Sequence, residues 1–193
     1  MKKITLLFFA MITIATVKSQ QLSQGDGMIN LGLGLSSYYT SGNGYKTKLP
    51  PIEGSYESMV SENISVGGFI GMYKSEYFYN YDGGGYDSGF DFTTKFNYFD
   101  LGAIGNYHFV NTDKFNAYAG ARLGYVSSKV SYEGLDLEDD YFNEFLKNRD
   151  YKSSGAFFAL QIGARYFLSD SFALNAELGY GVSLLKVGAT IKL

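Results

Sequence analysis

The sequence contains no cysteine and no tryptophan, and it has only one histidine and two prolines among 193 residues. The absence of cysteine excludes disulfides, thiolate catalysis and cysteine-ligated zinc sites. The formal net charge is only −3, so no basic field indicates binding to nucleic acid. The chain also lacks a phosphate-binding glycine loop and metal-ligand spacing, and we therefore expect neither a cofactor nor a metal.

Glycine and aromatic residues are abundant instead. The chain has 24 glycines, and aromatic residues make up 18% of it, drawn from 18 tyrosines and 16 phenylalanines. High glycine with little proline suits many strands that pack closely. The length fits a single domain.

The N-terminus predicts export. Lys2 and Lys3 precede an apolar run over residues 4–17, and small residues follow. This order is typical of a secretory signal peptide, so we expect residues 1–19 to be cleaved and residues 20–193 to form the mature domain. A transmembrane anchor is the alternative, but the run is shorter than the roughly 20 residues that a spanning helix needs.

The stretch "INLGLGLSSY" shows the pattern that dominates the rest of the chain. Bulky Ile29, Leu31 and Leu33 alternate with small or polar residues, and period-two alternation predicts a strand. The second face of this strand is almost bare, in the sense that it carries only small side chains or none. Similar alternation marks eight segments in all: residues 29–38, 51–60, 64–73, 99–109, 115–125, 156–168, 172–182 and 185–193. Each is close to the 9–11 residues that a tilted membrane strand requires.

The connections between these segments alternate in length. Short polar turns lie at residues 61–63, 110–114 and 169–171, whereas longer links lie at residues 40–49, 79–92 and 133–154. Outer-membrane barrels have this asymmetry, with short periplasmic turns and long extracellular loops. We therefore predict an all-β fold: a closed, antiparallel, up-and-down transmembrane β-barrel of about eight strands. The alternative is a secreted soluble barrel of the lipocalin or avidin kind.

Barrel closure explains the bare face. An eight-stranded interior is only wide enough for side chains to fill it, so the small face points inward and the bulky face meets lipid. Buried charges without partners cost several kcal/mol, and we expect those of the inner face to pair. The predicted network consists of Glu53, Glu57, Asp100 and Glu177 with Arg122, Arg165, Lys186 and Lys192.

The signal peptide, the eight alternating segments, the charged inner face and the terminal "ELGYGVSLLKVGATIKL" together resemble a known family. The chain is similar to the small outer-membrane β-barrel proteins of Gram-negative bacteria typified by OmpA's barrel and OmpX. The resemblance covers residues 20–193. It implies a monomer in the outer membrane that contacts outer-membrane lipid and depends on the insertion machinery. The chain ends in Leu193, whereas the family's assembly signal often ends in an aromatic residue.

His108 is the main candidate for catalysis because it is the only histidine. In a barrel that deacylates lipid A, a serine would lie two residues after the histidine, where this chain has Val110. His108 also precedes a predicted periplasmic turn, whereas acyl-chain chemistry on lipid A occurs in the outer leaflet. We therefore expect an interior or rim histidine that has no catalytic partner.

The predicted outer loops supply the remaining candidates. Tyrosine-rich segments offer a large amphipathic area for an extracellular partner, through Tyr77, Tyr79, Tyr81, Tyr86, Tyr141 and Phe142. The first of these residues could equally extend a strand into an interfacial aromatic girdle. A run of acids could bind calcium, but it lacks the residue order of an EF-hand and a solvated loop is the default: Asp136, Glu138, Asp139 and Asp140.

Three function classes follow from these observations. The favoured class is a non-enzymatic barrel with a plugged, ion-paired interior that acts in envelope structure or in surface interaction through its loops. The second class is a narrow pore or small-ligand carrier, which requires a continuous water path. The third is a lipid-modifying enzyme, which requires a catalytic pair.

Overall fold

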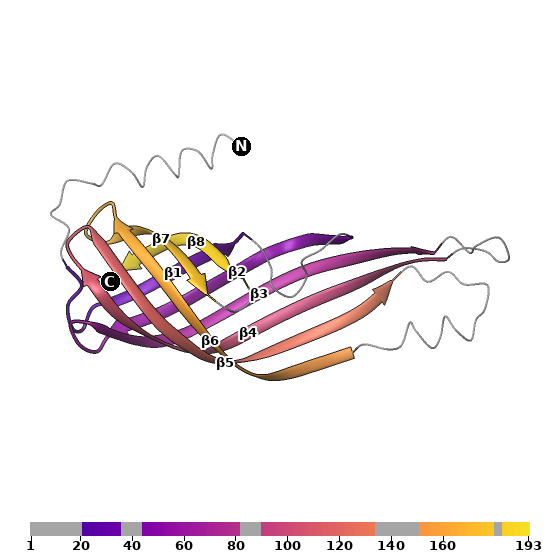
Figure 1. The fold of residues 1–193 in the computed structure, drawn as a ribbon, viewed down its shortest axis with the longest axis horizontal. Coiled ribbons are helices and arrows are strands. Elements are labelled where there is room, and N and C mark those ends of the chain that lie inside the picture. The colour runs from indigo at the N-terminus through magenta and orange to yellow at the C-terminus, as the bar shows by residue number, and fades with distance from the viewer. Residues whose placement is uncertain (1–20, 36–43, 82–89, 134–150, 180–182) are drawn as a thin grey trace.

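The chain folds into a closed barrel of eight antiparallel strands in sequence order, and β1 pairs with β8 (Figure 1). The computed structural model describes residues 21–35, 44–81, 90–133, 151–179 and 183–193, without the side chains at positions 80, 81, 90 and 91. The strands are β1 (Gly27–Gly34), β2 (Tyr45–Met59), β3 (Ile64–Tyr81), β4 (Phe90–Asn111), β5 (Phe115–Glu133), β6 (Tyr151–Phe167), β7 (Phe172–Gly179) and β8 (Leu185–Lys192). The predicted fold class is confirmed. No helix within the described ranges has the length and apolarity to cross a membrane.

The strands differ in length more than the alternation predicted. β1, β7 and β8 have 8 residues each, whereas β3, β4, β5 and β6 have 18, 22, 19 and 17. The pairing of β3 with β4 runs unbroken as far as Tyr81 and Phe90, inside a segment expected to be a loop. That expectation was wrong because the alternation continues in β3 with its polarity reversed, and because tyrosine, phenylalanine and threonine favour strands. As a result β2–β6 project beyond the barrel (Figure 1).

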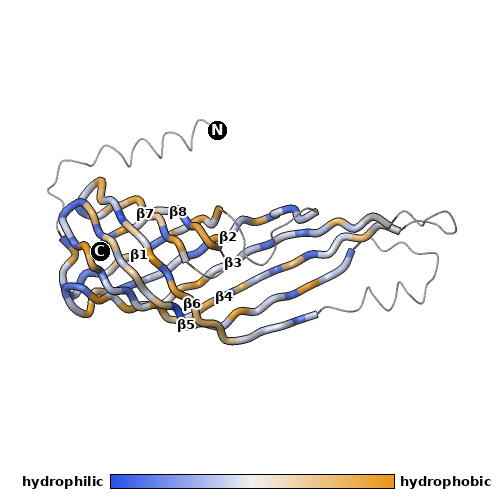
Figure 2. The backbone as a smooth tube through the Cα atoms, viewed as in Figure 1, coloured by the Kyte–Doolittle hydropathy of each residue, from blue (hydrophilic) through white to orange (hydrophobic). Residues whose placement is uncertain are grey.

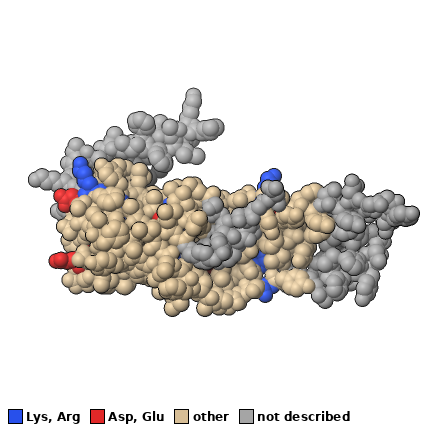
Figure 3. All heavy atoms as spheres, in the orientation of Figure 1, with Lys and Arg blue, Asp and Glu red and all other residues tan. Residues whose placement is uncertain are grey.

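The two faces of the barrel differ as the alternation implies. Large apolar side chains point outward, and Leu31, Leu123 and Leu160 are 58%, 63% and 61% exposed. Figure 2 shows apolar and polar residues alternating along the barrel strands. Figure 3 shows a broad band almost without charged side chains between the turn end and the projecting end. The inner face is small or polar and buried.

Close approach of neighbouring backbones explains several inward glycines. A side chain at Gly67 would collide with the carbonyl oxygen of Tyr56, and one at Gly188 would collide with that of Leu31. These positions leave no room for a Cβ atom. Gly155, in the projecting part of β6, differs because nothing lies within 4 Å of its Cβ position.

Residues 21–26 close over the turn end of the barrel. Leu22 is only 1% exposed and belongs to a buried cluster with Met28, Met59, Phe167 and Ala173. Its backbone is held by Asn111, whose Nδ2 donates to the Leu22 carbonyl oxygen at 2.9 Å. We call residues 21–26 the leader. A single apolar residue among polar ones has no periodicity, so the sequence did not predict that Leu22 packs here. The predicted signal peptide at residues 1–19 lies outside the described residues.

Candidate functional site

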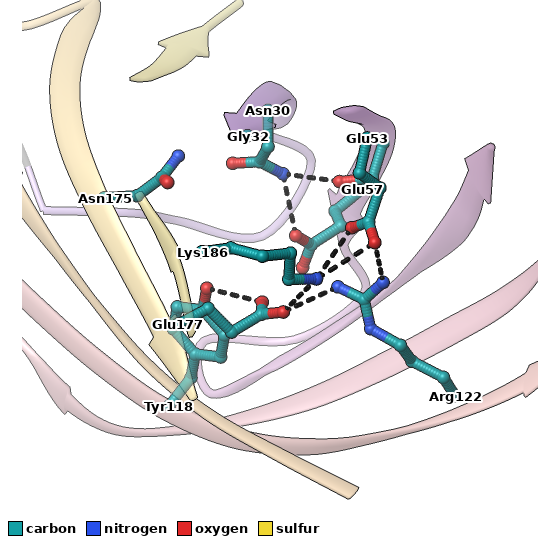
Figure 4. Close-up of a pocket in the computed structure, with 10 residues that line it drawn as sticks. Asn30, Gly32, Glu53, Glu57, Tyr118, Arg122, Asn175, Glu177 and Lys186 are labelled. Atoms are coloured by element: carbon teal, nitrogen blue, oxygen red, sulfur yellow. Dashed lines mark hydrogen bonds and ion pairs between the residues drawn. The ribbon is translucent and has the colours of Figure 1, made fainter. Parts of the chain in front are cut away.

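The centre of the barrel contains a closed ring of ion pairs built from four strands (Figure 4). Arg122 of β5 reaches Glu53 of β2 at 2.6 Å and Glu177 of β7 at 2.8 Å. Lys186 of β8 contacts the same two carboxylates, at 2.9 Å and 2.5 Å. Each cation therefore bridges both acids, and we call these four residues the quartet. All four side chains are at most 15% exposed.

A second pair lies nearer the turn end. Arg165 Nη2 donates to Glu57 Oε1 at 2.6 Å, and its guanidinium carbon stands 4.3 Å from the centre of the Tyr118 ring. Glu57 also accepts hydrogen bonds from Asn30, Ser65 and Asn106 at 2.6–2.8 Å. The charge of this buried carboxylate is well compensated, as a buried ion requires.

Two residues of the predicted network form no described ion pair with the quartet or with the second pair. Lys192 pairs with Asp26 at 2.9 Å, at the rim beside the leader, rather than with an acid of the lumen. Asp100 is 3% exposed, and its Oδ1 atom has no hydrogen-bond partner among the described residues. Six of the eight predicted residues thus pair inside the barrel, and Asp100 lies within electrostatic range of Arg122 and Lys186. The sequence did not show that Lys192 lies as far along the barrel axis as the rim.

His108 lies beside a serine, Ser65, that is distant from it in sequence. Its Nε2 atom lies 2.9 Å from Ser65 Oγ, and its Nδ1 atom lies 2.9 Å from Asn116 Oδ1. His108 is interior, as expected, but a serine does lie beside it, supplied by β3 rather than by a neighbouring position in sequence. All three residues are at most 1% exposed, and Ser65 Oγ also donates to Glu57 at 2.6 Å.

Free space around the quartet is small. The cavity among Asn30, Glu53, Tyr118 and Lys186 has a volume of about 20 Å³, room for about one water molecule. Above it Phe69 points inward, 5% exposed, with its ring 4.9 Å from the guanidinium carbon of Arg122. Phe69, a large residue on the inner face, thus covers the buried guanidinium of Arg122. No group of three metal-ligating side chains is found within the described part of the chain.

The alternation of faces inverts where the strands leave the barrel. We call residues 45–49, 73–81, 90–98, 126–133 and 151–157 the projecting sheet, and its inner face is the one continuous with the barrel interior. On β3, outward Met72 is followed by outward Lys74 and Glu76. The described charged residues of the projecting sheet all lie on its outer face: Lys46, Lys48, Lys74, Glu76, Lys95, Lys129, Glu133 and Lys152.

The inner face of the projecting sheet is aromatic. Its described side chains are tyrosine, phenylalanine, valine, serine and threonine, and the strand register places them side by side. The rings farthest from the barrel are Tyr45, Tyr77, Tyr79, Phe92, Phe96, Tyr132 and Tyr151. The alternative that the first tyrosine-rich residues extend a strand is confirmed, because Tyr77 and Tyr79 belong to β3. They point to this inner face, however, and not outward to a girdle.

Other predicted loop residues cannot be placed in the same way. The side chain of Tyr81 lies outside the described residues. So do Tyr86, Tyr141, Phe142 and the acidic run Asp136, Glu138, Asp139 and Asp140.

Comparison with known proteins identifies one family and several solved structures of similar fold. A model described as "Outer membrane protein beta-barrel domain" matches residues 4–191. OprG from Pseudomonas aeruginosa superposes with a TM-score of 0.54 at 14% identity, covering 89% of this chain and 97% of that one. Neisserial surface protein A gives 0.48 at 17%, covering 87% and 95%, and Ail of Yersinia pestis gives 0.48 at 14%, covering 88% and 95%. No curated protein sequence matches.

Proposed function

Since this chain belongs to the outer membrane protein beta-barrel family and is an integral protein of the bacterial outer membrane, we propose that it is a non-enzymatic, non-conducting barrel that acts in surface interaction. One observation supports this proposal above others: the inner face of the projecting sheet is aromatic and free of described charges. In this family the long connections face outward, so the projecting sheet stands outside the cell. A surface-exposed aromatic face of this kind is typical of binding sites.

The quartet argues against a pore. Its cations and carboxylates meet across the interior, and the cavity beside them holds about one water. Leu22 fills the periplasmic mouth. A conducting path would have to break several buried ion pairs at once, each strongly destabilising when one partner is left alone.

Burial argues against an enzyme. Ser65, His108 and Asn116 have the spacing of a nucleophile, a base and an orienting amide, but a catalytic serine must reach its substrate. These three side chains lie inside the periplasmic half of the barrel, whereas acyl chains of lipid are outside it. The Ser65 hydroxyl instead donates its hydrogen bond to Glu57.

The test places one charge on each face of the projecting sheet. Val130 points to the inner face and its neighbour Ser131 points to the outer face. Cells that display the protein should adhere to surfaces or to each other, and Val130→Lys should abolish that adhesion while Ser131→Lys should not. Purified wild-type protein should show no steady single-channel current in a planar bilayer. Equal adhesion by both variants, or a steady current, would contradict the proposal.

A further inference from the structure

Aromatic rings form a continuous row across four strands of the projecting sheet. Tyr79 of β3 and Phe92 of β4 have ring centres 5.1 Å apart, Phe92 and Tyr132 of β5 are 6.3 Å apart, and Tyr132 and Tyr151 of β6 are 6.4 Å apart. Tyr45 of β2 lies beside this row, with its ring 4.9 Å from that of Tyr77. These rings form one extended surface, which we call the floor: Tyr45, Tyr77, Tyr79, Phe92, Tyr132 and Tyr151.

Three rings of this floor are exposed and the others are half-buried. Tyr79 and Tyr151 are 37% and 51% exposed, and Tyr45 is 39% exposed. Tyrosine supplies both an apolar ring face and a polar hydroxyl, so such a floor offers stacking and hydrogen bonds together. Serine residues, at Ser128 and Ser153, add further hydroxyls to the same face.

The chemistry of the floor restricts its ligand. A polyanion or a charged peptide would meet no opposite charge, because the described lysines and glutamates of the projecting sheet lie on its outer face. A purely apolar ligand could form no hydrogen bond with the hydroxyls that it covers. A neutral sugar fits both demands, because its C–H face packs on an aromatic ring while its hydroxyls exchange hydrogen bonds with tyrosine and serine.

We propose that the inner face of the projecting sheet binds a neutral oligosaccharide, namely the outer saccharide of the glycolipid in the surrounding outer leaflet. This inference rests on the proposed function in surface interaction and names its partner. The position of the floor supports the surrounding glycolipid as the source of the saccharide. Met72 is the last outward apolar residue of β3 before Lys74. At roughly 3.3 Å per residue, Tyr79 lies about 20 Å farther along the strand, above the lipid head groups and among the saccharide chains.

A shallow, exposed floor also suits a ligand that is already present nearby. Saccharides of neighbouring lipids are held at the same surface, and a high local concentration allows modest affinity to give high occupancy. A soluble glycan from elsewhere would need tighter contacts.

The experiment measures saccharide binding by calorimetry with the full protein in detergent or nanodiscs. The probes are the polysaccharide that mild acid releases from the lipopolysaccharide of the source strain, a foreign neutral glucan, heparin as a polyanion, and a panel of extended peptides. Tyr77→Ala and Tyr132→Ala remove rings from the floor. Phe78→Ala is the matched control, because Phe78 follows Tyr77 in β3 but points to the outer face and is 57% exposed.

We expect the released polysaccharide to bind, with about tenfold weaker affinity in each tyrosine variant and no change in Phe78→Ala. A gel of unheated and boiled samples checks that each variant keeps a folded barrel. Tyr132→Phe keeps the ring and should bind more tightly than Tyr132→Ala.

Other results would overturn the inference in distinguishable ways. Binding that prefers the foreign glucan would exclude the cell's own glycolipid as the source. Peptide binding that depends on Tyr132, without saccharide binding, would exclude a glycan but leave the proposed surface interaction intact. Heparin binding unaffected by either tyrosine variant would place recognition elsewhere. If no probe binds and Val130→Lys does not reduce adhesion, both proposals fail.

Discussion

Arg122 Nη1 lies 2.6 Å from Glu53 Oε2, and this contact joins β5 to β2 across the barrel interior. Replacing Arg122 with methionine leaves Glu53 and Glu177 to share Lys186 alone. We expect a loss of about 3–5 kcal/mol in the free energy of unfolding, because a buried charge is left without its partner. Denaturant unfolding in lipid vesicles measures this loss.

The pair Lys95–Glu133 of the projecting sheet provides the control for that experiment, since its side chains are 33% and 61% exposed. Lys95→Met should cost no more than about 1 kcal/mol. An equal effect of the two variants would show that the quartet is no stronger than a surface pair.

A lipid-facing arginine should be costly within the barrel and harmless above it. Leu160 points outward and is 61% exposed, and Leu160→Arg should cost about 2–4 kcal/mol if the position lies near the bilayer midplane. Ser154 points outward from the same strand in the projecting sheet, so Ser154→Arg should change stability by less than about 0.5 kcal/mol. Vesicle unfolding compares the two, and similar costs would contradict the proposed membrane boundary.

Two glycines test the backbone approach. A methyl group at Gly67 collides with the Tyr56 carbonyl, so Gly67→Ala should cost about 1–3 kcal/mol. The space around Gly155 is open, and Gly155→Ala should be neutral or slightly stabilising. Urea midpoints measured in parallel decide the matter, and a neutral Gly67→Ala would show that the sheet relaxes at this point.

Ser65→Ala separates structural from catalytic roles. Glu57 and His108 would each lose a hydrogen bond, and we expect a cost of about 1–3 kcal/mol in stability. Mass spectra of lipid A from cells with and without the variant should be identical. A change in acylation that depends on Ser65 or His108 would indicate an enzyme.

Leu22→Ala should weaken the closure of the periplasmic mouth. The removed side chain is 1% exposed and packs with Met28 and Met59, so the expected cost is about 2–4 kcal/mol. The protein should still not conduct, because the quartet remains. Unfolding and planar-bilayer recordings on the same preparation test both statements, and a steady current would assign the barrier to Leu22 instead.

Much of the barrel could be predicted from period-two alternation. Alternation assigns each residue to one of the two faces of a strand, so Glu53, Arg122 and Glu177 could be assigned to the barrel interior from the sequence alone. The polar partners Asn30, Ser65 and Asn106 lie on the same face, and the alternation could have revealed them too. Their pairing could not be predicted because it depends on strand register and shear, which bring Ser65 of β3 against His108 of β4.

The projecting sheet was missed for a different reason. We expected strands to end where the apolar face ends, but the outward position after Met72 is a lysine in an unbroken strand. Outside the membrane the same alternation continues with its polarity reversed. A change in which face is polar, rather than a loss of alternation, is the sequence signal for such an extension.

The distribution of the quartet along the chain has a consequence for how the barrel forms. Glu53 and Lys186 are separated by 133 positions in sequence, and their strands flank β1 at the junction where the first and last strands meet. Until β8 reaches β1, Glu53 lacks one of its two cations, whereas Glu177 already faces Lys186 across the β7–β8 pair. Joining the first and last strands therefore completes the sheet and supplies the second cation of Glu53 in the same step.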